Sequence, residues 1–230
     1  MNSSKRIDAL RESWEDNAAN WTRAVREDLI ASRRDATNQA ILDAICALKP
    51  SHVLDVGCGE GWLTRTLKKD AACDAVGIDG SAELIEAARA QDTGGHYVHL
   101  AYETLAADPG VLSWSGQMAI CNFSILSEDI VPLLAAVRQK LEPNGHLLVQ
   151  TLHSWSARGP EGYQDGWRKD DFKALPGDDW APMSWYFRTL ESWVRDLGEA
   201  GFNLQEIREP RVPGSDEPVS LMFVCANGPA

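Results

Sequence analysis

The stretch Val53-Leu-Asp-Val-Gly-Cys-Gly-Glu-Gly-Trp-Leu63 is an apolar run that breaks into three alternating glycines and continues into a helical pattern. The four residues before the glycines have the β-branched, apolar character of a buried strand, and apolar residues recur at helical spacing after them. The glycines fall where the backbone must turn sharply and where a side chain would hold a ligand away from the main chain. We therefore predict a nucleotide-binding turn between a strand and a helix.

The spacing of the third glycine separates this turn from the dinucleotide fingerprint. G-x-G-x-x-G would need glycine at position 62, but the residue there is Trp62. A dehydrogenase seats its pyrophosphate on the helix N-terminus, whereas the tighter spacing favours a ligand that brings no phosphate to this loop. The next predicted strand, residues 75–79, ends in Asp79, whose carboxylate can accept both ribose hydroxyls of a nucleoside.

These features resemble the class I S-adenosylmethionine-dependent methyltransferases. Their first motif has the form hydrophobic-x-Asp-x-Gly-x-Gly-x-Gly, and their second strand ends in an acid. The resemblance extends from about Thr37 to Ala226. It implies a Rossmann-like, doubly wound, seven-stranded and mostly parallel sheet with an antiparallel last strand and helices on both faces. It also implies S-adenosyl-L-methionine as cofactor and S-adenosyl-L-homocysteine as product.

The resemblance assigns cofactor contacts by position. The first motif is expected to bind the methionine part through its backbone, Asp79 the ribose, and the residues after the third strand the adenine, although Ala101-Tyr-Glu-Thr104 departs from the usual acid followed by a small residue. Two N-terminal residues, Trp14 and Arg26, could also approach the methionine part, with core packing or solvation as the alternative. The predicted cofactor residues are Trp21, Asp55, Gly57, Cys58, Gly59, Gly61, Trp62, Asp79, Gly80, Ser81, Tyr102, Glu103, Asn122 and Phe123.

Composition limits the protein class. A length of 230 residues with 44% apolar content suits one α/β domain, and no apolar run is long enough for a membrane span. The five cysteines form no C-x-x-C pair and the first residues contain no apolar signal core, so we expect a cytoplasmic protein, as a monomer or homodimer. A net charge of −12 opposes an extended nucleic-acid surface.

Periodicity predicts four units: an N-terminal helical cap (1–34), a cofactor-binding core (35–152), an aromatic lid (153–187), and a C-terminal helix with two strands (188–230). Leu10, Trp14 and Trp21 fall on one stripe of the cap helix. Within the core we expect a helix over 128–141 beginning near Ser127-Glu-Asp129, a turn at Glu142-Pro-Asn-Gly145, and strands over 96–101, 117–121 and 145–151.

The segment 153–187 holds eight of the eighteen aromatic residues. Long irregular segments in compact domains are usually functional or disordered, and aromatic residues disfavour disorder. We interpret it as a lid over the methyl acceptor; the alternative is a satellite packing cluster that touches no ligand. His153, directly after the fifth strand, is a candidate general base or only a partner of the lid, and Tyr163 and Tyr186 are candidates for holding or polarising the acceptor.

No metal site is predicted, because His, Cys and acidic residues do not recur at zinc-ligand spacings. No G-x-S-x-G elbow supports a hydrolase. The leading interpretation is a methyltransferase acting on a small-molecule acceptor by in-line displacement, with no nucleic acid and no membrane as partner. Two alternatives are non-methylating S-adenosylmethionine chemistry on the same fold, and a non-catalytic binding protein.

Overall fold

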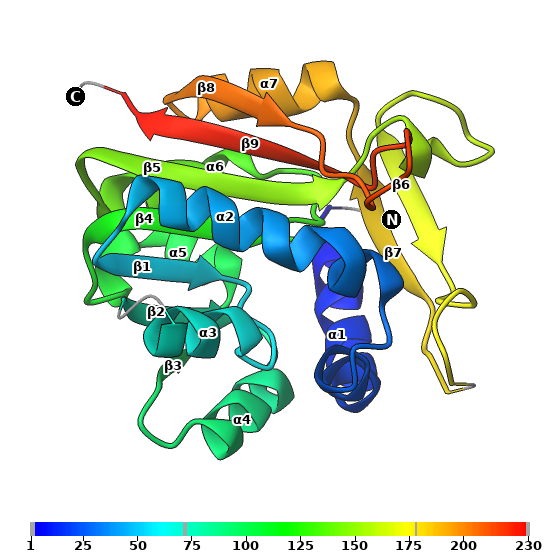
Figure 1. Cartoon of the computed structure of the whole chain (residues 1–230), viewed down its shortest axis with the longest axis horizontal. Helices are drawn as coiled ribbons and strands as arrows, with labels where there is room; N and C mark the ends of the chain where they lie inside the picture. Colours follow the sequence, from blue (N-terminus) through cyan, green and yellow to red (C-terminus); the bar gives the residue numbers. More distant parts are fainter. Residues whose placement is uncertain (1–2, 71–72, 178, 229–230) are drawn as a thin grey trace.

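A central sheet organises the chain (Figure 1). The computed structural model describes residues 3–70, 73–177 and 179–228. The parts of the predicted units at residues 1–2, 71–72, 178 and 229–230 lie outside the described residues. Seven strands lie in the order β3-β2-β1-β4-β5-β9-β8. They are β1 (His52–Val56), β2 (Asp74–Asp79), β3 (His96–His99), β4 (Gly116–Asn122), β5 (Leu141–Leu152), β8 (Phe202–Arg208) and β9 (Ser220–Asn227).

The predicted strand directions are confirmed. β1 to β5 pair in parallel, whereas β9 runs antiparallel to both β5 and β8. Central strands such as β4 read as nearly continuous apolar runs because both faces of the sheet are covered. β1 has β2 on one side and β4 on the other, and the strand order reverses there, which opens a crevice at the carboxyl ends of these strands.

Helices cover both faces of the sheet (Figure 1). One core cluster joins the sheet to α2 and α3 through Ile41 and Leu67, and the other joins it to α5, α6 and α7 through Leu105, Leu134 and Leu197. The helices are α1 (Ser3–Arg26), α2 (Asn38–Leu48), α3 (Trp62–Asp70), α4 (Ala82–Gln91), α5 (Tyr102–Ala107), α6 (Val131–Lys140) and α7 (Leu190–Glu199). No helix among the described residues combines the length and apolarity that crossing a membrane requires.

Three local predictions were wrong: two in their bounds, and one in the kind of structure expected. The helix expected over 128–141 begins only at Val131, with Pro132 in its first turn where a missing N–H costs nothing, so Ser127 to Asp129 precede it. The expected turn at 142–145 is a bulge within β5, in which Asn144 takes a φ of 65°. The third strand ends at His99 instead of residue 101, because Ala101 already precedes α5.

The segment 153–187 folds back over α1. It contains a short two-stranded sheet of β6 (Gly166–Asp170) and β7 (Met183–Phe187). Asn17 ties the two parts together, since its Nδ2 donates to the Ala181 carbonyl and its Oδ1 accepts from the Ala181 amide, both at 2.8 Å. Phe172 and Met183 are buried beside Leu10 of α1 in an aromatic cluster. α1 and this segment therefore form one layer beside the carboxyl edge of the sheet (Figure 1).

Candidate functional site

A cavity of about 1000 Å³, its open mouth included, lies at the carboxyl edge of the sheet under α1. Loops after β1, β2, β3 and β4 line the cavity, and α1 supplies residues such as Trp14 and Trp21. All of the predicted cofactor residues line this cavity except Asp55 and Gly61. The topology thus brings together residues that are separated by up to about a hundred positions in the sequence.

The three glycines after β1 differ in what a side chain would meet. A Cβ at Gly57 would lie 2.2 Å from Tyr102 Oη, and one at Gly61 would lie 2.7 Å from the Tyr97 ring, so packing excludes side chains at both. A Cβ at Gly59 would meet nothing within 4 Å, although its φ of 56° favours glycine. Gly59 is therefore the glycine that leaves open space at the cavity, while Gly57 and Gly61 allow close packing of the loop.

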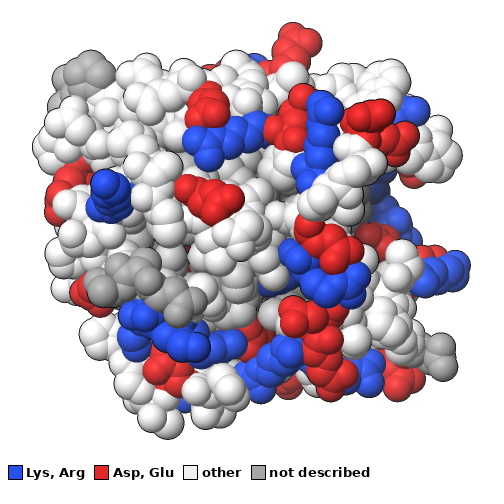
Figure 2. Space-filling view, viewed as in Figure 1, with Lys and Arg blue, Asp and Glu red and all other residues white. Residues whose placement is uncertain are grey.

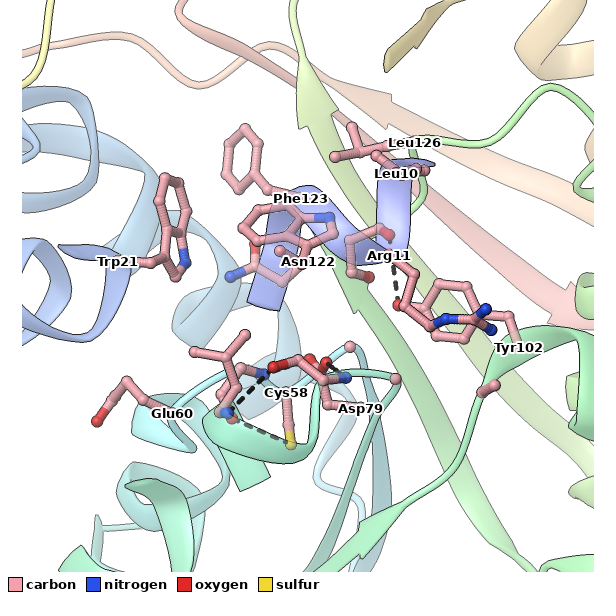
Figure 3. A pocket seen from close by; sticks show the side chains of 18 of the residues that line it. Leu10, Arg11, Trp21, Cys58, Glu60, Asp79, Tyr102, Asn122, Phe123 and Leu126 are labelled. Atoms are coloured by element: carbon pink, nitrogen blue, oxygen red, sulfur yellow. Dashed lines mark hydrogen bonds between the residues drawn. The ribbon is translucent and has the colours of Figure 1, made fainter. Parts of the chain in front are cut away.

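Asp79 joins the loops after β1 and β2. Its Oδ2 accepts from the Gly59 amide at 2.9 Å, and its Oδ1 accepts from the Ser81 amide at 2.8 Å (Figure 3). Burial raises the pKa of this carboxyl, while the two backbone N–H groups oppose that rise. The carboxylate lines the cavity, where its remaining lone pairs can accept hydroxyl groups.

The loops after β3 and β4 complete the lining of the cavity. The Tyr102 hydroxyl donates to the Ser124 carbonyl at 3.3 Å, and burial raises the pKa of this phenol. Asn122 accepts from Gln150 Nε2 at 2.8 Å, which fixes its amide. Phe123 adopts a φ of 55°, a left-handed conformation that costs energy for a side chain of this size. This backbone conformation turns the chain at the end of β4, beside the cavity.

Glu15 joins α1 to the N-terminus of α4. Its carboxylate accepts from the Ala82 amide at 2.8 Å and from Ser81 Oγ at 3.0 Å, at the N-terminus of α4. A carboxylate is stabilised there by the unpaired amides and the helix dipole. α1 is thereby anchored directly beside Asp79.

The structure identifies a cavity residue that the sequence analysis missed. Arg26 is engaged elsewhere, because its Nε contacts Glu60 at 2.8 Å and its Nη2 donates to the Ala87 carbonyl at 2.9 Å. Arg33 instead lines the cavity, with its guanidinium 4.8 Å from the Trp62 ring centroid. Its buried Nη2 has no hydrogen-bond partner within the described part of the chain, and burial lowers its pKa to about 10. A half-buried arginine whose Nη2 has no partner among the described residues is suited to a carboxylate ligand.

Asp55 does not line the cavity. It is 2% exposed and accepts from Thr64 Oγ1 at 3.0 Å, which joins β1 to α3. Burial raises its pKa to about 7. Asp55 therefore stabilises the strand and helix that flank the glycine-rich loop and does not line the cavity.

The free energy of unfolding is expected to fall as the pH rises from about 4 to about 7, since Asp55 ionises near its ordinary pKa of 3.8 when unfolded but stays protonated to about 7 when folded. Asp55→Asn keeps an acceptor for Thr64 and should flatten this dependence. Urea denaturation across that range measures it, with exposed Asp74→Asn at the start of β2 as the control. If the free energy of unfolding fell equally with pH in the wild type and in Asp55→Asn, Asp55 would not be the group responsible.

The three candidate catalytic residues lie outside the cavity. His153 Nε2 contacts Glu209 Oε1 at 2.9 Å, and the Tyr163 hydroxyl accepts from the Leu190 amide at 2.9 Å. Tyr186 lines a separate small cavity and packs its ring against Trp167. The structure therefore does not bring His153, Tyr163 and Tyr186 together with the cofactor residues.

Comparisons with known proteins agree with this architecture. Residues 53–145 match the family model described as a methyltransferase domain. The chain is 32% identical over 143 residues to a malonyl-[acyl-carrier protein] O-methyltransferase of Enterobacter lignolyticus, a match that covers 61% of this chain and 53% of that protein. The chain thus spans about half the length of this curated relative.

Two solved structures show the same fold. An S-adenosylmethionine-dependent methyltransferase of Mesorhizobium loti is 22% identical, with a TM-score of 0.58 over 80% of this chain and 96% of the other. The 1,6-didemethyltoxoflavin-N1-methyltransferase of Burkholderia thailandensis, solved with its substrate and S-adenosylhomocysteine, is 16% identical, with a TM-score of 0.66 over 100% of this chain and 92% of the other.

Proposed function

We propose that this chain, which belongs to the class I S-adenosylmethionine-dependent methyltransferases, transfers the methyl group of S-adenosyl-L-methionine to a small-molecule acceptor and releases S-adenosyl-L-homocysteine. The observation that carries the proposal is the pairing of Gly59 and Asp79 at the cavity. An open glycine backbone beside a carboxylate on the next strand suits a nucleoside that brings no phosphate to the loop.

Each part of the cofactor has a matching part of the cavity. Asp79 would accept the ribose hydroxyls, and Tyr102 and Glu103 at the start of α5 would flank the adenine. Arg33 would pair with the carboxylate of the methionine part, which gives its orphaned Nη2 an acceptor. Because Trp62 already packs against the guanidinium, Arg33 is held in place before the ligand arrives.

When bound, the cofactor supplies an electrophilic methyl group on a sulfonium. The contribution of the chain is to align acceptor, methyl and sulfur and to exclude water. α1 serves as the cap in this proposal, and the segment 153–187 serves as the lid that holds α1 down through Asn17 and the aromatic cluster. His153, which pairs with Glu209 outside the cavity, is not assigned the role of a base.

A small-molecule acceptor is supported by the shape and charge of the chain. Residues of α1 line one side of the cavity, and the net charge is −12. Figure 2 shows Lys and Arg interspersed with Asp and Glu on the face that it presents. A nucleic acid would require clustered cations.

Asp79→Ala is expected to weaken S-adenosyl-L-homocysteine binding about tenfold or more, because the ribose hydroxyls and two backbone amides lose their acceptor at a cost of about 1–3 kcal/mol. Isothermal calorimetry measures this. Asp74→Ala, at the far and exposed end of the same strand, is the matched control and should bind like the wild type. Equal affinities of the wild type and Asp79→Ala, or comparable binding of NAD, would refute the proposed function.

A further inference from the structure

Opposite the glycine-rich loop, the described residues that line the cavity are mainly apolar. Figure 3 shows Cys58 and Asp79 on one side of the cavity and Leu10, Phe123 and Leu126 on the other. That far wall also includes the indole of Trp14 from α1. An acceptor lying between this wall and the cofactor would meet mainly apolar surface.

Three acidic side chains, Glu60, Asp79 and Glu103, line the cavity among the described residues. Glu60 is 1% exposed and is ion-paired with Arg26 and Arg65 at 2.8 Å each. Asp79 serves two backbone amides, and Glu103, in the first turn of α5, is the residue that the proposed function places beside the adenine.

The other ionisable groups at the cavity are not bases either. Burial raises the pKa values of the Cys58 thiol and the Tyr102 phenol, so both stay protonated. No histidine lines the cavity among the residues that the structure describes. Among the described residues that line the cavity, we therefore assign none as a general base for the acceptor.

The chemistry of the acceptor follows from this assignment. An aliphatic amine with a pKa near about 10 is protonated at neutral pH, and an alcohol keeps its proton, so both would need a base. A carboxylic acid with a pKa near about 4 is already ionised and has lone pairs ready for attack. Of these three nucleophiles, the carboxylate is the one that needs no base in such a cavity.

Arg11 is the cation that could meet such an anion. It lines the cavity from α1, the helix that also supplies Leu10. Its Nη2 contacts Asp8 at 2.8 Å, but the two side chains are 46% and 51% exposed, and such surface pairs are weak enough to be exchanged for a ligand. Arg33, the other arginine at the cavity, is assigned to the cofactor.

We propose that the acceptor is an organic acid with an apolar body, methylated on a carboxylate oxygen, with Arg11 binding the carboxylate. This inference rests on the proposed function. A carboxylate oxygen forms a bond to the methyl carbon, the methyl–sulfur bond breaks, and its electron pair stays on sulfur. The products are a methyl ester and S-adenosyl-L-homocysteine. The negative charge of the carboxylate and the positive charge of the sulfonium cancel, and no proton is transferred.

The test compares three probes with one body: 3-phenylpropanoate, 3-phenylpropan-1-ol and 3-phenylpropylamine. Each is titrated by calorimetry into protein saturated with S-adenosyl-L-homocysteine. We expect the acid to bind at least about tenfold more tightly than the alcohol or the amine, and Arg11→Gln to remove most of that ratio. Arg6→Gln is the control, because Arg6 lies on the same helix but contacts Trp167 and Glu128 outside the cavity. This variant should keep the wild-type ratio of the affinity for the acid to that for the alcohol or the amine.

The outcomes separate the two proposals. If S-adenosyl-L-homocysteine itself does not bind, the proposed function fails and this inference fails with it. If it binds but the acid has no advantage, if none of the probes binds, or if Arg6→Gln and Arg11→Gln reduce the ratio equally, only the carboxylate acceptor is overturned.

Discussion

Replacing Asp196 with Ala is expected to lower the free energy of unfolding by about 3–5 kcal/mol, the cost of leaving a buried charge without its partner. The side chains of Arg188 and Asp196 are 1% and 9% exposed, and their Nε and Oδ2 atoms lie 3.0 Å apart. Arg188 also donates to the carbonyls of Ser127 and Glu128, so it supports the segment that follows the cavity wall. Urea denaturation measures the loss.

Two further variants show whether burial is the cause. Glu86→Ala breaks an exposed pair with Arg89, whose side chains are 71% and 47% exposed, and should cost at most about 1 kcal/mol. The double variant Arg188→Met/Asp196→Leu removes both charges and should be more stable than Asp196→Ala alone. A loss below about 1 kcal/mol in Asp196→Ala would show that water reaches the guanidinium.

Arg33→Met is expected to weaken S-adenosyl-L-homocysteine binding by about thirtyfold or more, since truncating one partner of a buried ion pair costs at least about 2 kcal/mol. 5′-Methylthioadenosine lacks the amino-acid part of the cofactor, so its affinity should stay within about threefold, well under 1 kcal/mol. Calorimetry with both ligands isolates the contribution of the carboxylate.

Arg34→Met is the matched control for this prediction. Arg34 is the next residue and is paired with Asp35 at the surface, so both ligands should bind as in the wild type. Equal losses for the two ligands in Arg33→Met would mean that the variant disturbs the whole cavity and that Arg33 does not hold the carboxylate.

The backbone features of the site could be predicted from the sequence because they are local. Alternating glycines after an apolar run require a sharp turn wherever they occur, and the acid at the end of the next strand follows from the parallel topology. The same pattern could not distinguish Gly59, which faces open space, from Gly57 and Gly61, which make room for Tyr102 and Tyr97. That difference depends on rings from distant strands and helices.

The side chains with long-range partners could not be predicted. Arg26 and Arg33 look equivalent in the sequence, and only the folded chain shows that Glu60 engages Arg26, whereas Arg33 Nη2 has no hydrogen bond within the part of the chain that the structure describes. His153 follows a strand end, which favours a site residue, but it pairs with Glu209 from a different part of the chain and does not line the cavity. In both cases a residue more than thirty positions away in the sequence decides the role.

The anchoring of α1 by Glu15 has a kinetic consequence. The helix lines the cavity and caps α4 directly beside Asp79, so we expect release of a nucleoside held by Asp79 to require that this contact opens. Residence time is then governed by the undocking of a helix, a step slower than the loss of individual hydrogen bonds. The small acceptor and its product would exchange faster than the nucleoside. Turnover would thus follow an ordered sequence in which the nucleoside enters first and departs last.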